Sequence, residues 1–199
     1  ALEWTNPRTF GPLDLPGKLL AGFFHGANPR TAGFNSVDYA AMHESSWLVT
    51  DILMFIGAGS AGTTGGIRVT TFAVLVLMVA AEARGRSTVN AFRRRIPQAA
   101  QRQALTITLI GLGAVVAATL AITAQSGLPL SRTTFETFSA FGSAGMTTGI
   151  TAQLPLSSQN ILILLMFLGR TGPITLATAL ALREREPRYR YPEERPIIG

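Results

Sequence analysis

A glycine-rich stretch in the first third of the chain has the spacing of a phosphate-binding turn. It reads GAGSAGTTGGIR and places Gly57, Gly59 and Gly62 in the pattern Gly-x-Gly-x-x-Gly, after the apolar run ILMFI. In a soluble βαβ unit such a turn binds the pyrophosphate of a dinucleotide, and Glu82 lies near the position of a ribose-binding acid. Alternatively, the glycine stretch provides bare backbone, and a small ion can pass along this backbone or bind to it. The neighbouring elements decide between these two chemistries.

The composition of the chain favours a membrane protein. Of its 199 residues, 47% are hydrophobic and 14% are charged, and the mean hydropathy is +0.31. Soluble domains average about 25% charged residues. The chain has no cysteine for a disulfide or a thiolate metal site, and its two histidines offer little imidazole chemistry. We expect a protein that is not an enzyme and that holds no cofactor in this chain.

The basic residues form two blocks in the sequence. The formal net charge of +6 could suggest a nucleic-acid ligand, but these residues are not spread over one face, and we expect no nucleic-acid partner. The blocks are Arg84, Arg86, Arg93, Arg94, Arg95 and Arg102, and Arg183, Arg185, Arg188, Arg190 and Arg195. Basic residues in short loops stay on the cytoplasmic side of a membrane, so both blocks are predicted to be cytoplasmic.

Three long apolar segments are predicted to cross the membrane. Residues 104–124 contain no charge and residues 160–182 contain one, Arg170; a helix needs roughly 20 residues to cross the hydrocarbon core. Residues 47–81 are too long for one span and are interrupted by the glycine stretch, which indicates a broken span. An apolar run that feeds a spanning helix also argues against a soluble βαβ unit. The segment before the broken span and residues 125–159 are then external.

Each external segment contains a short helix followed by a glycine turn. Pro16 can open the first helix. Thr133, with Glu136 three residues later, has the spacing of a capping box that opens the second helix, which ends at Gly142. At 1.5 Å per residue each helix is about 15 Å long, half of a bilayer. Both segments are predicted to enter the membrane and return without crossing it.

The two external segments also match each other in sequence. TAGFNS begins at Thr31 and SAGMTT at Ser143, and MFIG begins at Met54 and MFLG at Met166. The same interval separates the members of both pairs, so the two matches share one offset without a gap. A shared offset indicates an internal duplication of a unit made of a re-entrant helix, a glycine turn and an inner span.

The glycine turns have the properties of an ion site. Non-helical backbone at membrane depth is tolerated only where protein buries it or where it lines water, because lipid cannot satisfy its amides. Ion filters use backbone carbonyls in place of a cation's hydration shell, and glycine allows the φ values that turn carbonyls inward. Gly33 and Gly145 are therefore the predicted pivots. The alternative is that these glycines only let helices pack closely.

Most isolated polar and aromatic residues have simpler explanations. His25 is expected in a loop or at an interface, Trp47 at the membrane interface, and Asp38 and Glu136 at helix ends or in water. Asp51 lies inside the broken span, where an acidic residue is a candidate for the ion path.

Five segments form an ordered set of motifs over essentially the whole chain. They are NPRTAGFNSVD, GTTGGIRVTTF, SAFGSAGMTTGIT, FLGRTGPITLA and RYPEERPIIG. Together they resemble the Trk/Ktr/HKT superfamily of potassium and sodium transporters, whose members have four helix, pore-loop, helix repeats around one ion path. The resemblance implies an all-α membrane protein in which this chain supplies two of an expected four repeats, with a broken inner helix.

The resemblance also implies a division of the chain. The third repeat, without most of its outer helix, occupies residues 1–83 and includes a gating loop at 57–68. A cytoplasmic basic loop follows at 84–103, then the fourth repeat at 104–182 and a cytoplasmic carboxyl tail at 183–199. Because the chain opens at ALEW without a starting methionine, we expect a fragment of a longer protein.

The same resemblance implies the site residues. The filter walls, whose carbonyls hold K⁺, are Thr31, Ala32, Gly33 and Phe34, and Ser143, Ala144, Gly145, Met146 and Thr147. The gate consists of Gly57, Gly59, Gly62, Thr63, Thr64, Gly65, Gly66, Arg68 and Arg170. In this arrangement the glycine stretch obstructs the path below the filter, and Arg170 lies near the same obstruction.

The implied function is potassium uptake across the bacterial inner membrane, with K⁺ as the transported ion. Sodium-selective or sodium-coupled transport in the same superfamily is the alternative, because two filter walls lie outside this sequence and AGMT replaces the more frequent valine-glycine-leucine-serine. A secondary transporter with discontinuous helices is a further alternative. The implied partners are the lipid bilayer, a second copy in a homodimer, and a cytosolic nucleotide-binding regulatory ring of the TrkA or KtrA type.

Overall fold

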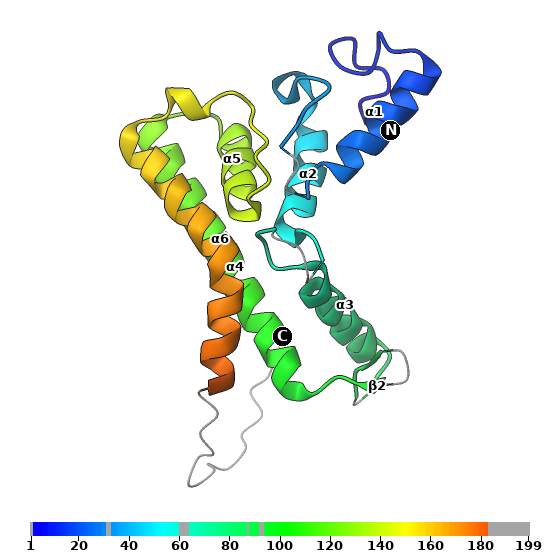
Figure 1. Cartoon of the computed structure of the whole chain (residues 1–199), viewed down its shortest axis with the longest axis vertical. Coiled ribbons are helices and arrows are strands. Elements are labelled where there is room, and N and C mark those ends of the chain that lie inside the picture. The colour runs from blue at the N-terminus through cyan, green and yellow to red at the C-terminus, as the bar shows by residue number, and fades with distance from the viewer. Residues whose placement is uncertain (1, 31–32, 60–63, 87, 92–93, 183–199) are drawn as a thin grey trace, which may run out of the picture.

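The computed structural model describes residues 2–30, 33–59, 64–86, 88–91 and 94–182, with side chains through residue 172. Within these ranges the chain is mostly helical (Figure 1), in agreement with a helical membrane protein. The helices are α1 (Leu15–Ala27), η1 (Tyr39–Ala41), α2 (Glu44–Ile56), α3 (Val69–Ala83), α4 (Gln98–Ser126), α5 (Leu130–Gly142), η2 (Thr151–Gln153) and α6 (Leu156–Leu182). Two short strands, β1 (Asn90–Ala91) and β2 (Arg94–Arg95), pair in the predicted basic loop, where the description all-α does not hold.

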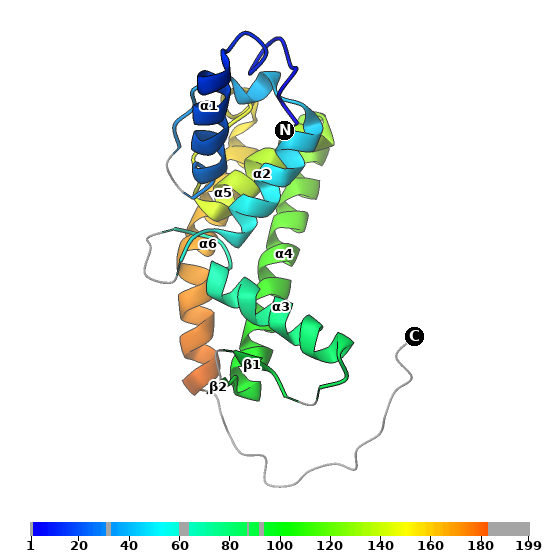
Figure 2. The same cartoon turned by 90° about the vertical axis from the view of Figure 1, so that its right-hand side faces the viewer.

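Two long helices pack against each other along the molecule (Figures 1 and 2). α4 has 29 residues and α6 has 27, and they cover the predicted spans 104–124 and 160–182. By length and composition, α4 is the one helix in the described part of the chain that meets the requirement for crossing a membrane, and α3 is a shorter apolar helix.

Two separate helices stand where the sequence predicts a broken span. α2 ends at Ile56 and α3 begins at Val69, so the interruption coincides with the glycine stretch. Gly57 ends α2 with a φ of 71°, in the left-handed region that glycine adopts without steric cost. α2 packs on α5, whereas α3 packs on α4. The break therefore lets one apolar segment contact two different parts of the fold.

The first short helix begins as expected. Asp14 caps α1, because its side chain accepts a hydrogen bond from the N–H of Gly17 at 3.0 Å, and Pro16 lies in the first turn.

The second short helix begins earlier than predicted, so the capping box was wrong. α5 follows Pro129, and Thr133 lies inside the helix with its hydroxyl donating to the Pro129 carbonyl at 3.3 Å. The carboxylate of Glu136 contacts the loop after the helix instead of its start. Thr133 is completely buried, and we attribute the earlier start to the burial of this turn against the core.

α5 is the centre of the hydrophobic core. Phe141 belongs to a cluster with residues of α4 and α6, and Phe135 belongs to a second cluster with residues of α2 and η1. Trp47 is part of this second cluster; it is buried, and its indole N–H donates to the Tyr39 carbonyl at 2.8 Å. Trp47 therefore packs inside the protein instead of facing outward as a lipid anchor.

Corresponding helices in the two halves of the chain begin at a nearly constant interval in the sequence. The interval from the start of η1 to the start of η2 equals the offset of the sequence match, and so does the interval from α2 to α6. The interval from α1 to α5 is slightly longer, because α1 ends six residues before Gly33 whereas α5 ends three residues before Gly145. The sequence offset therefore matches the structure from the glycine turns onward.

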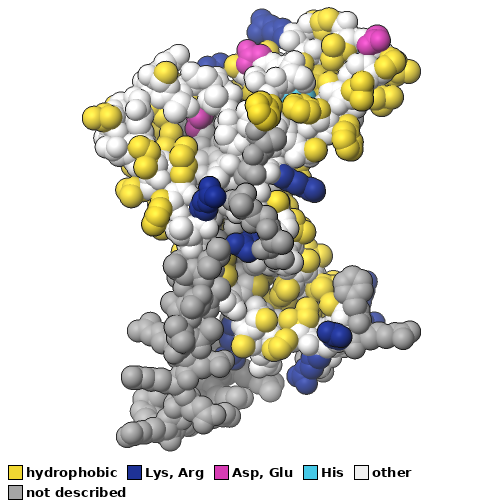
Figure 3. Space-filling view, viewed as in Figure 1, with side chains coloured by type: hydrophobic (Ala, Val, Ile, Leu, Met, Phe, Trp, Pro, Cys, Tyr) yellow, Lys and Arg dark blue, Asp and Glu magenta, His cyan; other side chains and the backbone are white. Residues whose placement is uncertain are grey.

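Groups of apolar side chains lie on the face of the molecule that Figure 3 shows. α1 exposes Leu19, Leu20 and Phe23, and α4 exposes Leu109 and Ile110 among others. Exposed apolar surface of this extent is typical of a protein that faces lipid or further protein.

Glu3 ties the segment before α1 to the start of α2. Its buried carboxylate accepts hydrogen bonds from the Asn6 amide at 2.5 Å, the Thr9 hydroxyl at 2.8 Å and the Ser46 hydroxyl at 2.5 Å, and from the His43 N–H at 2.8 Å. Burial raises the pKa of Glu3, but these hydrogen bonds outweigh it and lower the pKa below the ordinary 4.5.

We expect Glu3 to make stability depend on pH. A lowered folded-state pKa contributes stability that is present above the unfolded pKa of 4.5 and is lost as the pH falls through the lowered value. Glu3→Gln should therefore lower the free energy of unfolding at neutral pH by about 1 to 2 kcal/mol. Thermal unfolding of the purified proteins in detergent measures this effect. The difference in unfolding free energy between Glu3→Gln and wild type should become smaller below pH 4.5. A constant difference across that range would contradict this role.

Candidate functional site

The two glycine turns, which lie far apart in the sequence, contact each other in the fold. Gly33 has a φ of 69° and Gly145 a φ of 79°. A Cβ atom on Gly145 would lie 3.3 Å from the Cα of Gly33, and a Cβ on Gly33 would lie 3.4 Å from the carbonyl oxygen of Ala144. We call Gly33 and Phe34 the first turn and residues 143–147 the second turn. Thr31 and Ala32, also predicted for the first turn, lie outside the described residues.

Residues of the second turn alternate between buried and exposed. Ala144 and Met146 are buried, whereas Gly145 and Thr147 between and after them are exposed. The hydroxyl of Ser139 on α5 donates to the Met146 carbonyl at 2.5 Å. This alternation anchors every second side chain in the core and leaves the intervening backbone at the surface.

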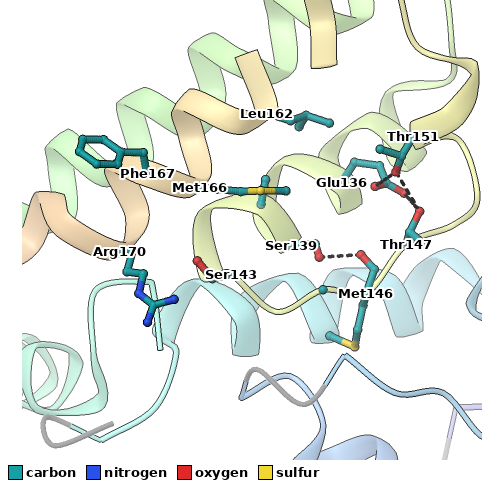
Figure 4. Close-up of a pocket in the computed structure, with 12 residues that line it drawn as sticks. Glu136, Ser139, Ser143, Met146, Thr147, Thr151, Leu162, Met166, Phe167 and Arg170 are labelled. Carbon is teal, nitrogen blue, oxygen red and sulfur yellow. Dashed lines mark hydrogen bonds between the residues drawn. The ribbon is translucent and has the colours of Figure 1, made fainter. Parts of the chain in front are cut away.

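Glu136 fastens the chain that follows the second turn. Its carboxylate is buried and accepts from the hydroxyls of Thr147 at 2.5 Å and Thr151 at 2.8 Å (Figure 4). It also accepts from the hydroxyl of Thr148 at 3.2 Å and from the Thr148 N–H at 2.8 Å. Sequence reasoning assigned Glu136 to a helix end or to water and missed this role. The signal was the threonine-rich run MTTGIT after the turn, which supplies the donors that a buried carboxylate requires.

A cavity of about 540 Å³ opens beside the second turn. Its lining includes Glu136, Ser139 and Ser143 from α5 and its end, and Met166 and Arg170 from α6 (Figure 4). Arg170 is exposed, so its charge faces this cavity and the open surface. The predicted gate residue and the predicted filter residues therefore share one space.

The glycine stretch folds under the end of α5. A Cβ on Gly65 would lie 2.6 Å from the carbonyl oxygen of Phe141, and a Cβ on Gly57 would collide with the carbonyl of Gly65. Gly66 has a φ of 86°, and a Cβ there would lie 2.8 Å from the Phe55 carbonyl oxygen. The backbone can approach this closely only because these side chains are absent.

The other predicted gate residues differ in their surroundings. Thr64 is buried, and Arg68 has a φ of 74° at the start of α3. A Cβ on Gly59 would meet no atom of the described residues within 4 Å, so none of them crowds this glycine. Gly62 and Thr63 lie outside the described residues.

The arrangement does not fit a dinucleotide site. The phosphate-binding turn of such proteins follows a β-strand. Here the glycine stretch follows α2 and packs on the end of α5. Asp51, the candidate acid of the broken span, is buried in α2 and is not part of the cavity lining.

Comparison with known proteins gives consistent matches. The model of the TrkH family, described as a cation transport protein, matches residues 4–189. The chain is 41% identical over 198 residues to Ktr system potassium uptake protein B of Bacillus subtilis, covering 100% of this chain and 44% of that protein. It is 38% identical over 198 residues to the protein of the same name from Vibrio alginolyticus, covering 100% of this chain and 43% of that protein.

A third relative carries a broader name. The chain is 36% identical over 188 residues to potassium/sodium uptake protein NtpJ of Enterococcus hirae, covering 92% of this chain and 42% of that protein. The chain thus spans less than half the length of these curated relatives. The matches confirm the resemblance seen in the five motifs, and the family and these relatives are named as transport or uptake proteins, not as enzymes. From the extent of the family match and the identity to these relatives, the chain belongs to the TrkH family of cation transport proteins.

Proposed function

We propose that this chain forms two of the walls of the ion path in a bacterial potassium uptake transporter. The observation that carries the proposal is the direct contact between Gly33 and Gly145, both with positive φ. The carbonyl oxygens of Ala144 and Gly145 lie 3.4 and 3.8 Å from the position that a Gly33 Cβ would take. A cation beside the two adjoining walls would exchange its hydration shell for backbone carbonyl oxygens of this kind.

The short helices support the same function. α5 ends at Gly142, directly before the second turn, and the carboxyl end of a helix carries about half a negative charge. This partial charge favours a cation over an anion at the turn. The repeated helix starts support two pore-loop repeats, at residues 1–83 and 104–182, within an expected four.

The gate in this proposal consists of the loop at 57–68 and Arg170. The loop packs on the end of α5 through Gly65, and Arg170 faces the cavity beside Ser143. Gly65 and Arg170 both lie near Ser143, where the second turn begins. An ion leaving the filter would therefore meet a backbone obstruction and a positive charge.

The remaining parts of the proposal concern the complete transporter. The arginine blocks favour a cytoplasmic position for residues 84–103 and for the carboxyl tail. A homodimer and a cytosolic nucleotide-binding ring of the TrkA or KtrA type are the proposed protein partners. Potassium is the proposed ion, and sodium-selective or sodium-coupled transport is the second candidate, favoured by the potassium/sodium name of the Enterococcus hirae relative.

The filter is tested by Gly33→Ala and Gly145→Ala in the complete transporter. A side chain at positive φ costs about 1 to 2 kcal/mol and would displace the facing carbonyls, so we expect the preference for K⁺ over Na⁺ to fall about 5-fold. Uptake of rubidium and sodium into proteoliposomes measures this preference. Gly127→Ala is the matched control, because Gly127 also has positive φ (65°), but a Cβ there would meet no described atom within 4 Å. If Gly33→Ala and Gly145→Ala keep the same K⁺ over Na⁺ preference as Gly127→Ala and wild type, the filter assignment is refuted.

A further inference from the structure

The residue after α1, Asn28, joins the first turn to the second. Its side chain is 2% exposed. The amide nitrogen donates to the carbonyl oxygen of Phe34 and to the hydroxyl of Tyr39 at 3.1 Å, and it lies 3.5 Å from the sulfur of Met146. One amide group therefore contacts the first turn, η1 and the buried side of the second turn.

The Phe34 carbonyl has little else to hold it. The Phe34 side chain is 71% exposed, so packing does not fix the backbone. No backbone-to-backbone hydrogen bond among the described residues involves residues 33–37. The amide of Asn28 is thus the contact that sets where this carbonyl points.

Tyr39 gives the amide nitrogen of Asn28 a second, firmly held partner. The Tyr39 ring is 2% exposed and packs on Phe135 with 5.7 Å between ring centroids. Its hydroxyl also lies 2.9 Å from Nδ1 of His25, and its carbonyl accepts from the indole of Trp47. Asn28 is therefore held between a fixed aromatic hydroxyl and a backbone that would otherwise be loosely placed.

The second turn is supported by different chemistry. There Glu136 accepts from three threonine hydroxyls, whereas Asn28 donates from an amide. Thr151, which opens η2, bonds to Glu136, and Tyr39, which opens η1, bonds to Asn28. Tyr39 and Thr151 thus occupy the same position in the two repeats and support the two turns. The Thr151 hydroxyl donates to Glu136, whereas the Tyr39 hydroxyl accepts from Asn28.

We infer that Asn28 is a positioning residue that sets the ion preference by orienting the Phe34 carbonyl against the second turn. This role rests on the proposed function of the two turns as filter walls. In this inference the Asn28 amide, which lies outside both turns, controls the orientation of the Phe34 carbonyl in the first turn.

The test compares Asn28→Ala and Asn28→Asp with Asn6→Ala in the complete transporter. Both Asn28 variants remove the amide donor, and Asp retains the shape of the side chain. Asn6 is a matched control, since its side chain is 5% exposed and its amide donates to Glu3 and to the Ala41 carbonyl at 3.0 Å, away from both turns. From the loss of one hydrogen bond we expect the K⁺ over Na⁺ preference to fall about 3-fold in the Asn28 variants and to stay unchanged in Asn6→Ala.

Tyr39→Phe is a second variant for the case that the Asn28 variants do not reach the membrane. It removes the hydroxyl that anchors the amide and retains the ring packing, so the preference should fall by a smaller factor. Wild-type preference in Asn28→Ala and Asn28→Asp, or in Tyr39→Phe where only that variant can be measured, would overturn the inference. If Gly33→Ala and Gly145→Ala shift the preference and these variants do not, only the role of Asn28 fails. If the glycine variants also have no effect, the filter itself fails.

Discussion

Arg170→Ala is expected to raise basal cation flux through the complete transporter about 10-fold, because it removes a positive charge that opposes a cation in the path. Arg170 lines the cavity that also contains Ser143 and Glu136 (Figure 4). A lone arginine within a membrane helix is expected to face water or protein rather than lipid. In the proposed ion path, its exposed guanidinium would repel a cation that passes the second turn. Rubidium uptake into proteoliposomes without the regulatory partner measures the basal flux.

Two variants separate charge from position. Arg170→Lys keeps the positive charge and loses the planar fork of donors, so most of the barrier should remain. Arg132→Ala removes another exposed arginine, near the start of α5, that does not line the cavity, and its flux should equal that of wild type. If the alanine variant at 170 inserts normally and transports at the wild-type rate, Arg170 is not part of the gate.

Gly65→Ala is expected to produce a second large increase in flux, also about 10-fold. The new methyl group would lie 2.6 Å from the Phe141 carbonyl oxygen and 3.0 Å from the Gly142 carbonyl carbon, both backbone atoms that cannot rotate away. Overpacking of this kind costs about 1 to 3 kcal/mol, which destabilises the loop in its position against α5. If the loop obstructs the ion path as proposed, more frequent displacement of the loop lets more ions pass. The same rubidium uptake assay reports the effect.

Gly113→Ala is the matched control for Gly65→Ala. It makes the same chemical change in α4, outside the gating loop, and a Cβ at Gly113 meets no described atom within 4 Å. Its flux should match that of wild type. A Gly65→Ala protein that folds and conducts no faster than Gly113→Ala would assign the loop a packing role alone.

The helical framework follows largely from the local sequence. The uncharged run at 104–124 is long enough to span a membrane, and α4 covers it. The glycine stretch predicts the break between α2 and α3, because glycine is a poor helix former and adopts the positive φ seen at Gly57 and Gly66. The start of α5 at Leu130 was missed, because burial of Thr133 against the core outweighs the local capping signal.

The roles of individual polar residues depended on contacts far along the chain. Glu136 was expected at a helix end, but its carboxylate binds threonines 11 to 15 residues away. Asn28 gave no signal at all, since a single asparagine after a helix is a common end residue and its contact with Met146 joins positions 118 residues apart. Nothing in residue spacing specifies which donor meets which acceptor across a fold.

The sequence by itself determined the class of the protein, the family to which it belongs, the constant offset between its two halves and the two pivot glycines. The class follows from composition and hydropathy, and the two glycines follow from backbone preferences that act within a few residues. The family rests on the resemblance of the five ordered motifs, and the offset rests on the two matched pairs of segments. Only the tertiary structure decided that Gly33 and Gly145 touch, that Gly65 lies under the end of α5, and that Arg170 shares a cavity with the second turn. Those contacts arise because α5 is buried against α2, α4 and α6, and the packing of whole helices sets the distances between their ends.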